Sequence, residues 1–116
     1  MQRFLLVDDD PAAEARLRGV LRQSADWDMV CVRSGAVALA TLADQPFAAV
    51  VVDLAVLGAD ALDFLQTAHD RFPGVVRMVM SSLDDATTVL RAGPVSHQFL
   101  AKSIAPARVL QALDRA

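Results

Sequence analysis

The sequence predicts an α/β protein with a doubly wound parallel sheet, and three observations indicate this fold class. Short, dense apolar runs, typical of strands buried on both faces of a parallel sheet, recur along the chain. Segments with helical spacing alternate with these runs, as in crossover connections. The chain has 116 residues, which suits one domain, since single domains most often have about 100–150 residues. We therefore expect a single domain over residues 1–116.

Five apolar segments are expected to form the strands of this sheet. The last of them is the weakest, because it is less apolar than the others. Five strand and helix units in alternation suit a flavodoxin-like (βα)5 topology with the strand order 2-1-3-4-5. The expected strands are Phe4–Val7, Met29–Val32, Ala48–Val52, Val75–Met80 and Gln98–Ala101.

Helix start signals lie between the expected strands. Small polar residues cap helix N-termini, and proline is favoured in the first turn. We expect the second helix to end at about Ala43 and the fourth to stop before Gly93-Pro94. The expected starting or capping residues of the five helices are, in order, Asp10 with Pro11, Ser34, Asp60, Asp84 or Asp85, and Pro106.

Composition and charge exclude several classes of function. The chain has 14 acidic and 11 basic residues and lacks the basic cluster that would follow a phosphate backbone, so we expect no direct nucleic-acid binding. No apolar run approaches the roughly 18–20 residues that span a bilayer, so we expect a cytoplasmic protein without membrane contact. The single cysteine, Cys31, lies in an apolar stretch and is expected to be a buried, unreactive thiol.

Polar residues follow four of the expected strands, and these positions should hold the functional site. In an open parallel sheet, ligands bind at the carboxyl ends of the strands, so residues that end neighbouring strands converge there. The residues at these ends are Asp8, Asp9 and Asp10 after the first strand, Asp53 after the third, Ser81 and Ser82 after the fourth, and Lys102 after the fifth.

This set of side chains indicates a site for Mg²⁺ and a phosphoryl group. Clustered carboxylates repel one another unless a cation neutralises them. Oxygen ligands without histidine or cysteine favour a hard cation, and Mg²⁺ is the usual choice where a phosphoryl group supplies further ligands. A lysine ammonium and a serine hydroxyl are natural partners for phosphoryl oxygens. Lys102 is the only lysine of the chain.

The same residues resemble the receiver (CheY-like) domain of bacterial two-component response regulators over essentially the whole chain. The resemblance rests on the acidic pair after FLLV, the aspartate ending VVVD, the hydroxyl ending VMSS and the lysine ending FLAK, in that order. The phrases WDMVCVRSG, RFPGVVRMVMSS and VLRAGPVSHQFLAKS further resemble receivers that precede HDOD or HD-GYP output domains.

The resemblance implies a role for each of these positions. Asp53 would be the phosphoacceptor that forms an acyl phosphate, with Ser81 and Lys102 binding the phosphoryl oxygens. Phe99 would be the aromatic switch residue that rotates inward. Protein ligands of Mg²⁺ would be Asp8, Asp9, Asp53 and the backbone carbonyl of Ala55.

The resemblance also implies partners. A sensor histidine kinase or a phosphotransfer protein would supply the phosphoryl group. An output domain or downstream protein would read the switch through the face of the fourth helix, fifth strand and fifth helix. The domain would catalyse only its own phosphorylation and dephosphorylation. Whether it also forms a homodimer stays open.

Two departures from the family pattern keep an alternative function open. Ser103 follows the lysine where the family usually has a proline, and Leu57 stands in the loop after the phosphoacceptor where a proline is usual. A receiver-like interaction module that works without phosphorylation is therefore the alternative.

Two further classes fit the sequence less well. The Asp8-x-Asp10 spacing after a strand also resembles the start of a haloacid-dehalogenase-type phosphatase, in which Asp8 would be the nucleophile. In that family the lysine precedes the late acidic pair, whereas Lys102 follows Asp84-Asp85 here. A nucleotide or flavin site is disfavoured, because three aspartates after the first strand would repel a phosphate.

Overall fold

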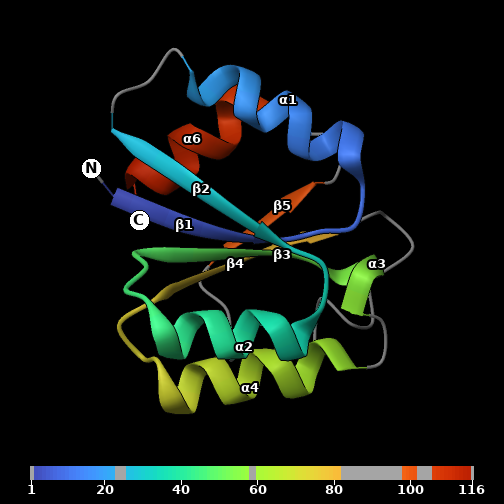
Figure 1. The fold of residues 1–116 in the computed structure, drawn as a ribbon, viewed down its shortest axis with the longest axis vertical. Helices are drawn as coiled ribbons and strands as arrows, with labels where there is room; N and C mark the ends of the chain where they lie inside the picture. Colours follow the sequence, from blue (N-terminus) through green and yellow to red (C-terminus); the bar gives the residue numbers. More distant parts are fainter. Residues whose placement is uncertain (1, 23–25, 58–59, 82–97, 102–105, 116) are drawn as a thin grey trace.

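A five-stranded parallel sheet lies between two layers of helices in the computed structural model (Figure 1). The structure describes residues 2–22, 26–57, 60–81, 98–101 and 106–115. The strand order is β2-β1-β3-β4-β5, which confirms the predicted topology. The strands are β1 Gln2–Val7, β2 Trp27–Val32, β3 Ala49–Asp53, β4 Val76–Ser81 and β5 Gln98–Ala101.

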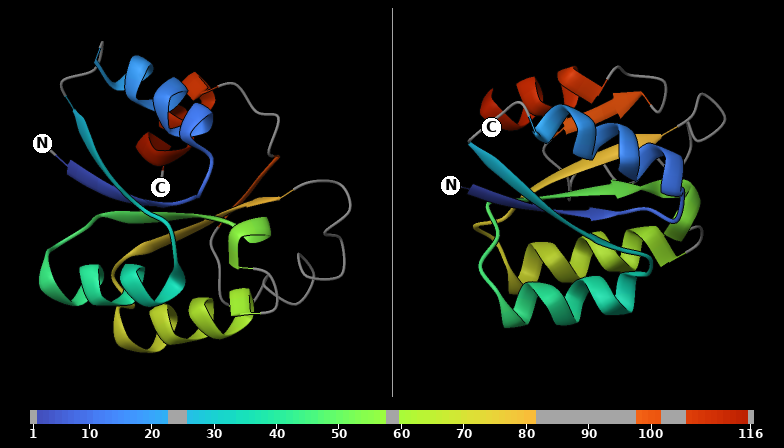
Figure 2. Two further views of the ribbon diagram at one scale, coloured as in Figure 1. Left: turned by 45° about the vertical axis from the view of Figure 1, so that its right-hand side comes forward. Right: turned by 45° about the horizontal axis from the view of Figure 1, so that its top comes forward.

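The helices pack on the two faces of the sheet in pairs. Figure 2 shows α1 and α6 together on one face and α2 and α4 together on the other, with α3 beside the end of β3. None of the described helices is long and apolar enough to cross a membrane. The helices are α1 Pro11–Leu21, α2 Gly35–Asp44, α3 Leu54–Leu57, α4 Ala61–Arg71 and α6 Pro106–Arg115.

One helix was not expected, and one expected helix cannot be compared. The short helix α3 begins directly after Asp53, where the sequence analysis expected a loop. Two helices, α3 and α4, therefore follow β3, and the strict alternation of single strands and single helices was wrong at this point. The expected fourth helix, after Asp84 or Asp85, lies outside the described residues.

Two of the predicted helix caps are confirmed by hydrogen bonds. The Asp10 carboxylate accepts from the backbone N–H of Ala12 at 3.0 Å, and the Ser34 hydroxyl accepts from the N–H of Val37 at 3.2 Å. Both bonds satisfy N–H groups that the first turn of a helix leaves without a partner. Asp60 also stands at the N-cap of α4, as expected, but its side chain makes no capping bond.

The core consists of two apolar clusters, one on each face of the sheet. Successive strand residues point to opposite faces, so Phe4 and Leu6 of β1 join the cluster under α1 and α6. Leu5 and Val7 join the cluster under α2 and α4. These four residues have no exposed surface. Burial on both faces explains why the strands are continuous apolar runs in the sequence.

Candidate functional site

Asp8 and Asp53 end neighbouring strands at the carboxyl edge of the sheet. Strands β1 and β3 pair in parallel with Val7 beside Val52, so the next residue of each strand is one of these two aspartates. Asp8 is 3% exposed and Asp53 is 0% exposed. Two carboxylates in neighbouring buried positions repel each other, and a cation between them would relieve that repulsion.

The short helix α3 orients the Asp53 carboxylate. Its Oδ1 accepts a hydrogen bond from the backbone N–H of Ala55 at 2.9 Å. This bond is possible because the chain turns into α3 directly after the strand, which brings the N–H two residues ahead back over the carboxylate. The bond restricts rotation of the carboxylate.

The loop between β1 and α1 is shaped by its own aspartates. Asp8 Oδ1 accepts from the backbone N–H of Asp10 at 3.1 Å, and Asp10 in turn caps α1. Asp9, between them, is exposed. The three consecutive aspartates therefore have different environments, and Asp8 is the one that is buried beside Asp53.

Residues at the end of β2 make hydrogen bonds to this loop. The N–H of Asp8 donates to the backbone oxygen of Val32 at 3.1 Å, and Arg33 Nη1 donates to the backbone oxygen of Asp9 at 3.3 Å. Arg33 was not among the predicted site residues. The available signal was its position, since it directly follows a strand that neighbours β1 in the predicted strand order.

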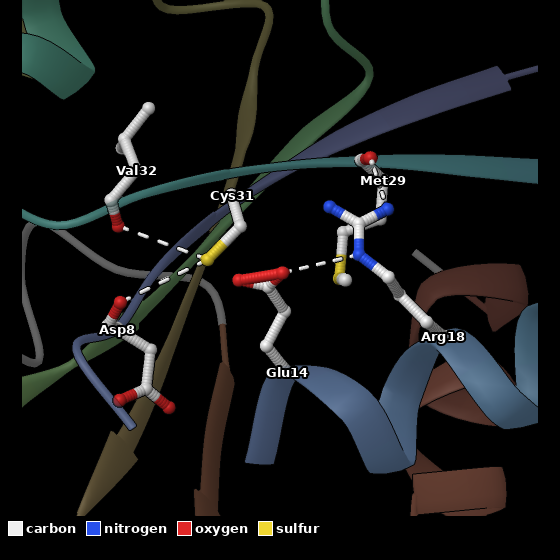
Figure 3. A network of polar contacts seen from close by, with 6 residues as sticks. All are labelled: Asp8, Glu14, Arg18, Met29, Cys31 and Val32. Carbon is white, nitrogen blue, oxygen red and sulfur yellow. Dashed lines mark hydrogen bonds and ion pairs between the residues drawn. The ribbon is translucent and has the colours of Figure 1, made fainter. Parts of the chain in front are cut away.

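Cys31 and Glu14 form a polar network next to the loop (Figure 3). The Cys31 sulfur lies 3.8 Å from the backbone oxygen of Asp8, and the Glu14 carboxylate lies between this sulfur and the Arg18 guanidinium. Arg18 Nε donates to Glu14 Oε2 at 3.1 Å. Hydrogen bonds from Cys31 and Arg18 hold the pKa of Glu14 below its ordinary value.

The thiol itself stays protonated at neutral pH. Burial, followed by its hydrogen bond with Glu14 and the negative charges of Glu14 and Asp8, raises the pKa of Cys31 to about 12. The expected burial was only partly right, because Cys31 is half-buried on the edge strand of the sheet. Since the thiolate is the reactive form, this environment makes Cys31 a weak nucleophile.

A hard cation at this edge would need further oxygen ligands besides the Asp8 and Asp53 carboxylates. Among the described residues, no three His, Cys, Asp or Glu side chains group closely enough to hold a metal ion. Asp8 and Asp53 bring carboxylate oxygens to adjacent strand ends, whereas the roles of Asp9 and of the Ala55 carbonyl as ligands stay predictions. This oxygen-only set is compatible with Mg²⁺, which usually keeps several waters and is held by one or two carboxylates.

The remaining predicted site residues are placed only in part. Ser81 is the half-buried last residue of β4 and pairs with Ala101 of β5. Asp53 pairs with Met80, so Ser81 lies one residue further along the neighbouring strand. Phe99 pairs with Val79 in β5; its side chain lies outside the described part of the chain, as do Lys102 and Ser103.

Comparison with known proteins identifies relatives over nearly the whole chain. Residues 4–114 match the response regulator receiver domain family. The hydrogenase transcriptional regulatory protein HoxA of Cupriavidus necator is 29% identical over 86 residues, which cover 74% of this chain and 17% of that protein. The chain therefore spans only a small part of this curated relative.

Solved structures share the fold. The signal receiver domain of an HD domain-containing protein from Pseudomonas fluorescens Pf-5 has a TM-score of 0.87 at 22% identity, covering 99% of this chain and 93% of that one. The response regulator TrrA of Thermotoga maritima, solved with Mg²⁺ and BeF, has a TM-score of 0.83 at 16% identity, covering 99% and 98%.

The resemblance seen in the sequence is thus confirmed at the level of the family and the fold. A closer relationship to receivers with HDOD or HD-GYP outputs stays a prediction. The parallel sheet in the order β2-β1-β3-β4-β5, the paired aspartates at its carboxyl edge and the match over residues 4–114 agree, and the chain belongs to the response regulator receiver domain family.

Proposed function

We propose that this domain accepts a phosphoryl group on Asp53 in a Mg²⁺-dependent reaction and thereby switches an output domain or a partner protein. The observation that carries the proposal is the buried Asp53 carboxylate at the end of β3, next to Asp8 at the end of β1. Receiver domains are signalling modules of two-component systems, and a lone strand-end aspartate is the position at which such a module would be modified.

The chemistry requires little more than a positioned carboxylate. The donor carries its phosphoryl group on a nitrogen atom, as in phosphohistidine or phosphoramidate. A carboxylate oxygen of Asp53 attacks phosphorus and forms a P–O bond. The bond from phosphorus to the donor nitrogen breaks, and its electron pair stays on that nitrogen. The bond from the Ala55 N–H holds the carboxylate during attack. When bound, Mg²⁺ would neutralise charge on the carboxylates and on the phosphoryl oxygens.

Several residues would hold the ion and the phosphoryl group. Asp8, Asp53 and the Ala55 carbonyl are the proposed protein ligands, with the exposed Asp9 contributing directly or through water. Ser81, at the end of the neighbouring strand β4, would hydrogen-bond a phosphoryl oxygen. Lys102, which follows β5, would pair with another.

Burial of Asp53 also shapes the reaction. Because its side chain has no exposed surface, a donor reaches it only after neighbouring groups move aside. The same cover would shield the acyl phosphate from water once it has formed. A change at this buried edge would reach the output face, which comprises β5, α6 and the expected fourth helix, with Phe99 as the switch residue.

The proposed partners follow from the family. A sensor histidine kinase or phosphotransfer protein would be the phosphoryl donor, and the cytoplasm is the proposed location. An output domain or downstream protein would read the switch, and a homodimer of the domain is one form that this reading could take.

The test is intact-protein mass spectrometry after incubation with phosphoramidate, with and without Mg²⁺. Wild type should gain one phosphoryl group only with Mg²⁺, and the adduct should be lost in hydroxylamine, which cleaves acyl phosphates. Asp53→Asn should gain none, although its similar shape preserves the fold. An adduct that survives in Asp53→Asn would contradict the assignment.

Two further variants make the test specific. Asp10→Asn, at the exposed cap of α1, is the matched control and should be phosphorylated like wild type. Asp8→Asn should need a higher Mg²⁺ concentration but still form the adduct. If Asp8→Asn abolishes the adduct while Asp53→Asn keeps it, the nucleophile is Asp8, as the phosphatase alternative requires.

Full burial of Asp53 also favours one second candidate, a receiver-like module that acts without phosphorylation. In that case Asp8 and Asp53 would stabilise the fold without being phosphorylated, and the domain would bind its partner in a single conformation. Beryllofluoride, which mimics a phosphoryl group, separates the two. Mg²⁺-dependent beryllofluoride binding to a folded protein supports the phosphorylation proposal, and its absence supports the module.

A further inference from the structure

A groove of about 460 Å³ opens between α2 and α4 and is lined by neither Asp8 nor Asp53. Figures 1 and 2 show these two helices side by side on one face of the sheet. Leu57 and Phe64 form its buried floor, and the half-buried Leu39 and Val56 form parts of its walls. The volume lies in the range of ligand pockets and could hold one or two large apolar side chains.

Small residues at the start of α2 let this helix pack directly against the floor of the groove. A Cβ atom at Gly35 would lie 3.2 Å from Leu57 Cδ2 and 3.5 Å from Phe64 Cδ2. The helix therefore approaches the floor more closely than any other residue would allow. Ala36, the next residue, is exposed at the rim and leaves the opening wide.

The rim of the groove is more acidic than basic. Asp60 and Asp63, one turn apart at the start of α4, are both exposed and line the groove, and Asp60 makes no capping bond. The basic residue among the lining groups is Arg33, whose guanidinium donates to the backbone of Asp9. Among the described residues, no hydrogen bond or ion pair engages the Asp60 and Asp63 carboxylates, which line an opening with an apolar floor.

The outer side of α2 extends this surface. Val37 is 52% exposed, the highest value for a large hydrophobic side chain in the described part of the chain. A second, shallower hollow runs along α2 beside Val37 and Ala40 to Asp44. Asp44 is the single charged residue of α2. The surface is therefore apolar along the helix and acidic at its margins.

We propose that the groove between α2 and α4 is a docking site for a basic amphipathic helix of a partner protein. Apolar side chains of such a helix would enter the groove, as in other complexes where a helix binds between two helices. Its lysine or arginine side chains would lie against Asp60 and Asp63, and this charge complementarity selects a basic occupant over an acidic one. The proposal is independent of phosphorylation at Asp53.

The probe for this test is a fluorescein-labelled peptide of leucine and lysine only, about 15–18 residues long so that it can form a helix. Its leucines recur at the i, i+3, i+4 and i+7 spacing of one helical face. One comparison peptide replaces lysine with glutamate, and another has the same composition in scrambled order. Fluorescence anisotropy should show the tightest binding for the amphipathic leucine and lysine peptide.

Variants locate the binding in the groove. Ala36→Arg places a bulky cation at the rim and should weaken binding of the basic peptide at least about tenfold, through steric blockage and like-charge repulsion. The double variant with Asp60→Lys and Asp63→Lys should prefer the glutamate peptide instead. Circular dichroism establishes that each variant is folded.

A matched double variant controls for net charge. Asp28→Lys with Asp70→Lys makes the same charge change at exposed positions on β2 and at the far end of α4, and should weaken binding less than about threefold through general electrostatics. Equal loss of binding in the two double variants would overturn the proposal, as would unchanged binding in Ala36→Arg or equal binding of the scrambled peptide.

Discussion

The two helical layers that cover the sheet are held in different ways. In the α1 and α6 layer, polar bonds join helices to strands: Trp27 Nε1 donates to Asp114 Oδ1 at 2.6 Å, and Arg18 Nη1 donates to the Met29 oxygen at 3.4 Å. In the α2 and α4 layer, Arg3 Nη1 of β1 donates to Oε1 of Gln45 at the end of α2 at 2.8 Å, but the start of α2 is fitted by close apolar contact around Gly35.

This difference indicates which substitutions would destabilise each layer. A layer with polar links loses stability when the buried member of a link, such as the Trp27 indole, loses its partner, because that group is left without a hydrogen bond. A layer fitted by volume loses stability when atoms are added. Gly35, Leu57 and Phe64, which make this close fit, also line the groove of the proposed docking site.

The largest expected effect is in the close-fitting layer. Gly35→Val adds a branched side chain where even a single Cβ would lie 3.2 Å from Leu57. We expect the free energy of unfolding to fall by about 2–3 kcal/mol, in the range of overpacked sites. Urea unfolding followed by circular dichroism measures it. An unchanged midpoint would mean that α2 can move away freely and that the fit is loose.

Gly19→Ala in the other layer is the matched control. A Cβ at Gly19 meets nothing within 4 Å, and the residue is exposed in the interior of α1. We expect an increase in unfolding free energy of about 0.5–1 kcal/mol, because alanine favours the helix over glycine. The opposite signs of the two glycine substitutions would sharpen the contrast between the layers.

An intermediate effect is expected at the link between β2 and α6. Asp114→Ala leaves the indole N–H of Trp27, which is 5% exposed, without its acceptor, and should lower the unfolding free energy by about 1–2 kcal/mol. Asp114→Asn keeps an acceptor oxygen and should cost less. Because Trp27 is the only tryptophan, its fluorescence reports the change directly. Equal losses in both variants would show that charge, not the bond, matters.

The strands and the caps could be predicted because their signals are local. Apolar runs buried on both faces leave a clear mark in the sequence, and Asp10 and Ser34 cap helices through bonds to residues two or three positions away. The short helix α3 was not predicted. Its sequence, LAVL, continues the apolar character of β3, and the residue that caps it, Asp53, ends the apolar run VVVD and was assigned to the functional site instead of to a helix start.

The centre of the candidate site was predictable for a different reason. Parallel strands end at the same edge, so strand order alone brings Asp8 next to Asp53. The contacts of Arg33 with Asp9 and of Glu14 with Cys31 depend on side-chain conformations across separate elements. Sequence spacing carries no such information. The exposure of Asp9 beside the buried Asp8 likewise follows from the path of the loop.

The smallest expected effect concerns the link through Glu14 in the α1 and α6 layer. Hydrogen bonds from Cys31 and Arg18 lower the pKa of Glu14, so the folded state binds this proton less tightly than the unfolded state does. The resulting stabilisation is present above the ordinary glutamate pKa of about 4.3 and is lost as pH falls through the lower folded pKa.

Glu14→Gln should therefore lower the unfolding free energy at neutral pH by only about 0.3–0.5 kcal/mol, since the pair with Arg18 lies near the surface. The difference from wild type should disappear at acidic pH below the lowered folded pKa, where the glutamate is protonated in both states. Urea unfolding at the two pH values measures it, and Arg16→Gln, at an exposed position of α1, controls for helix charge. A difference that persists at low pH would mean that the Glu14 side chain acts through packing, and the α1 and α6 layer would then resemble its counterpart more closely than the polar links indicate.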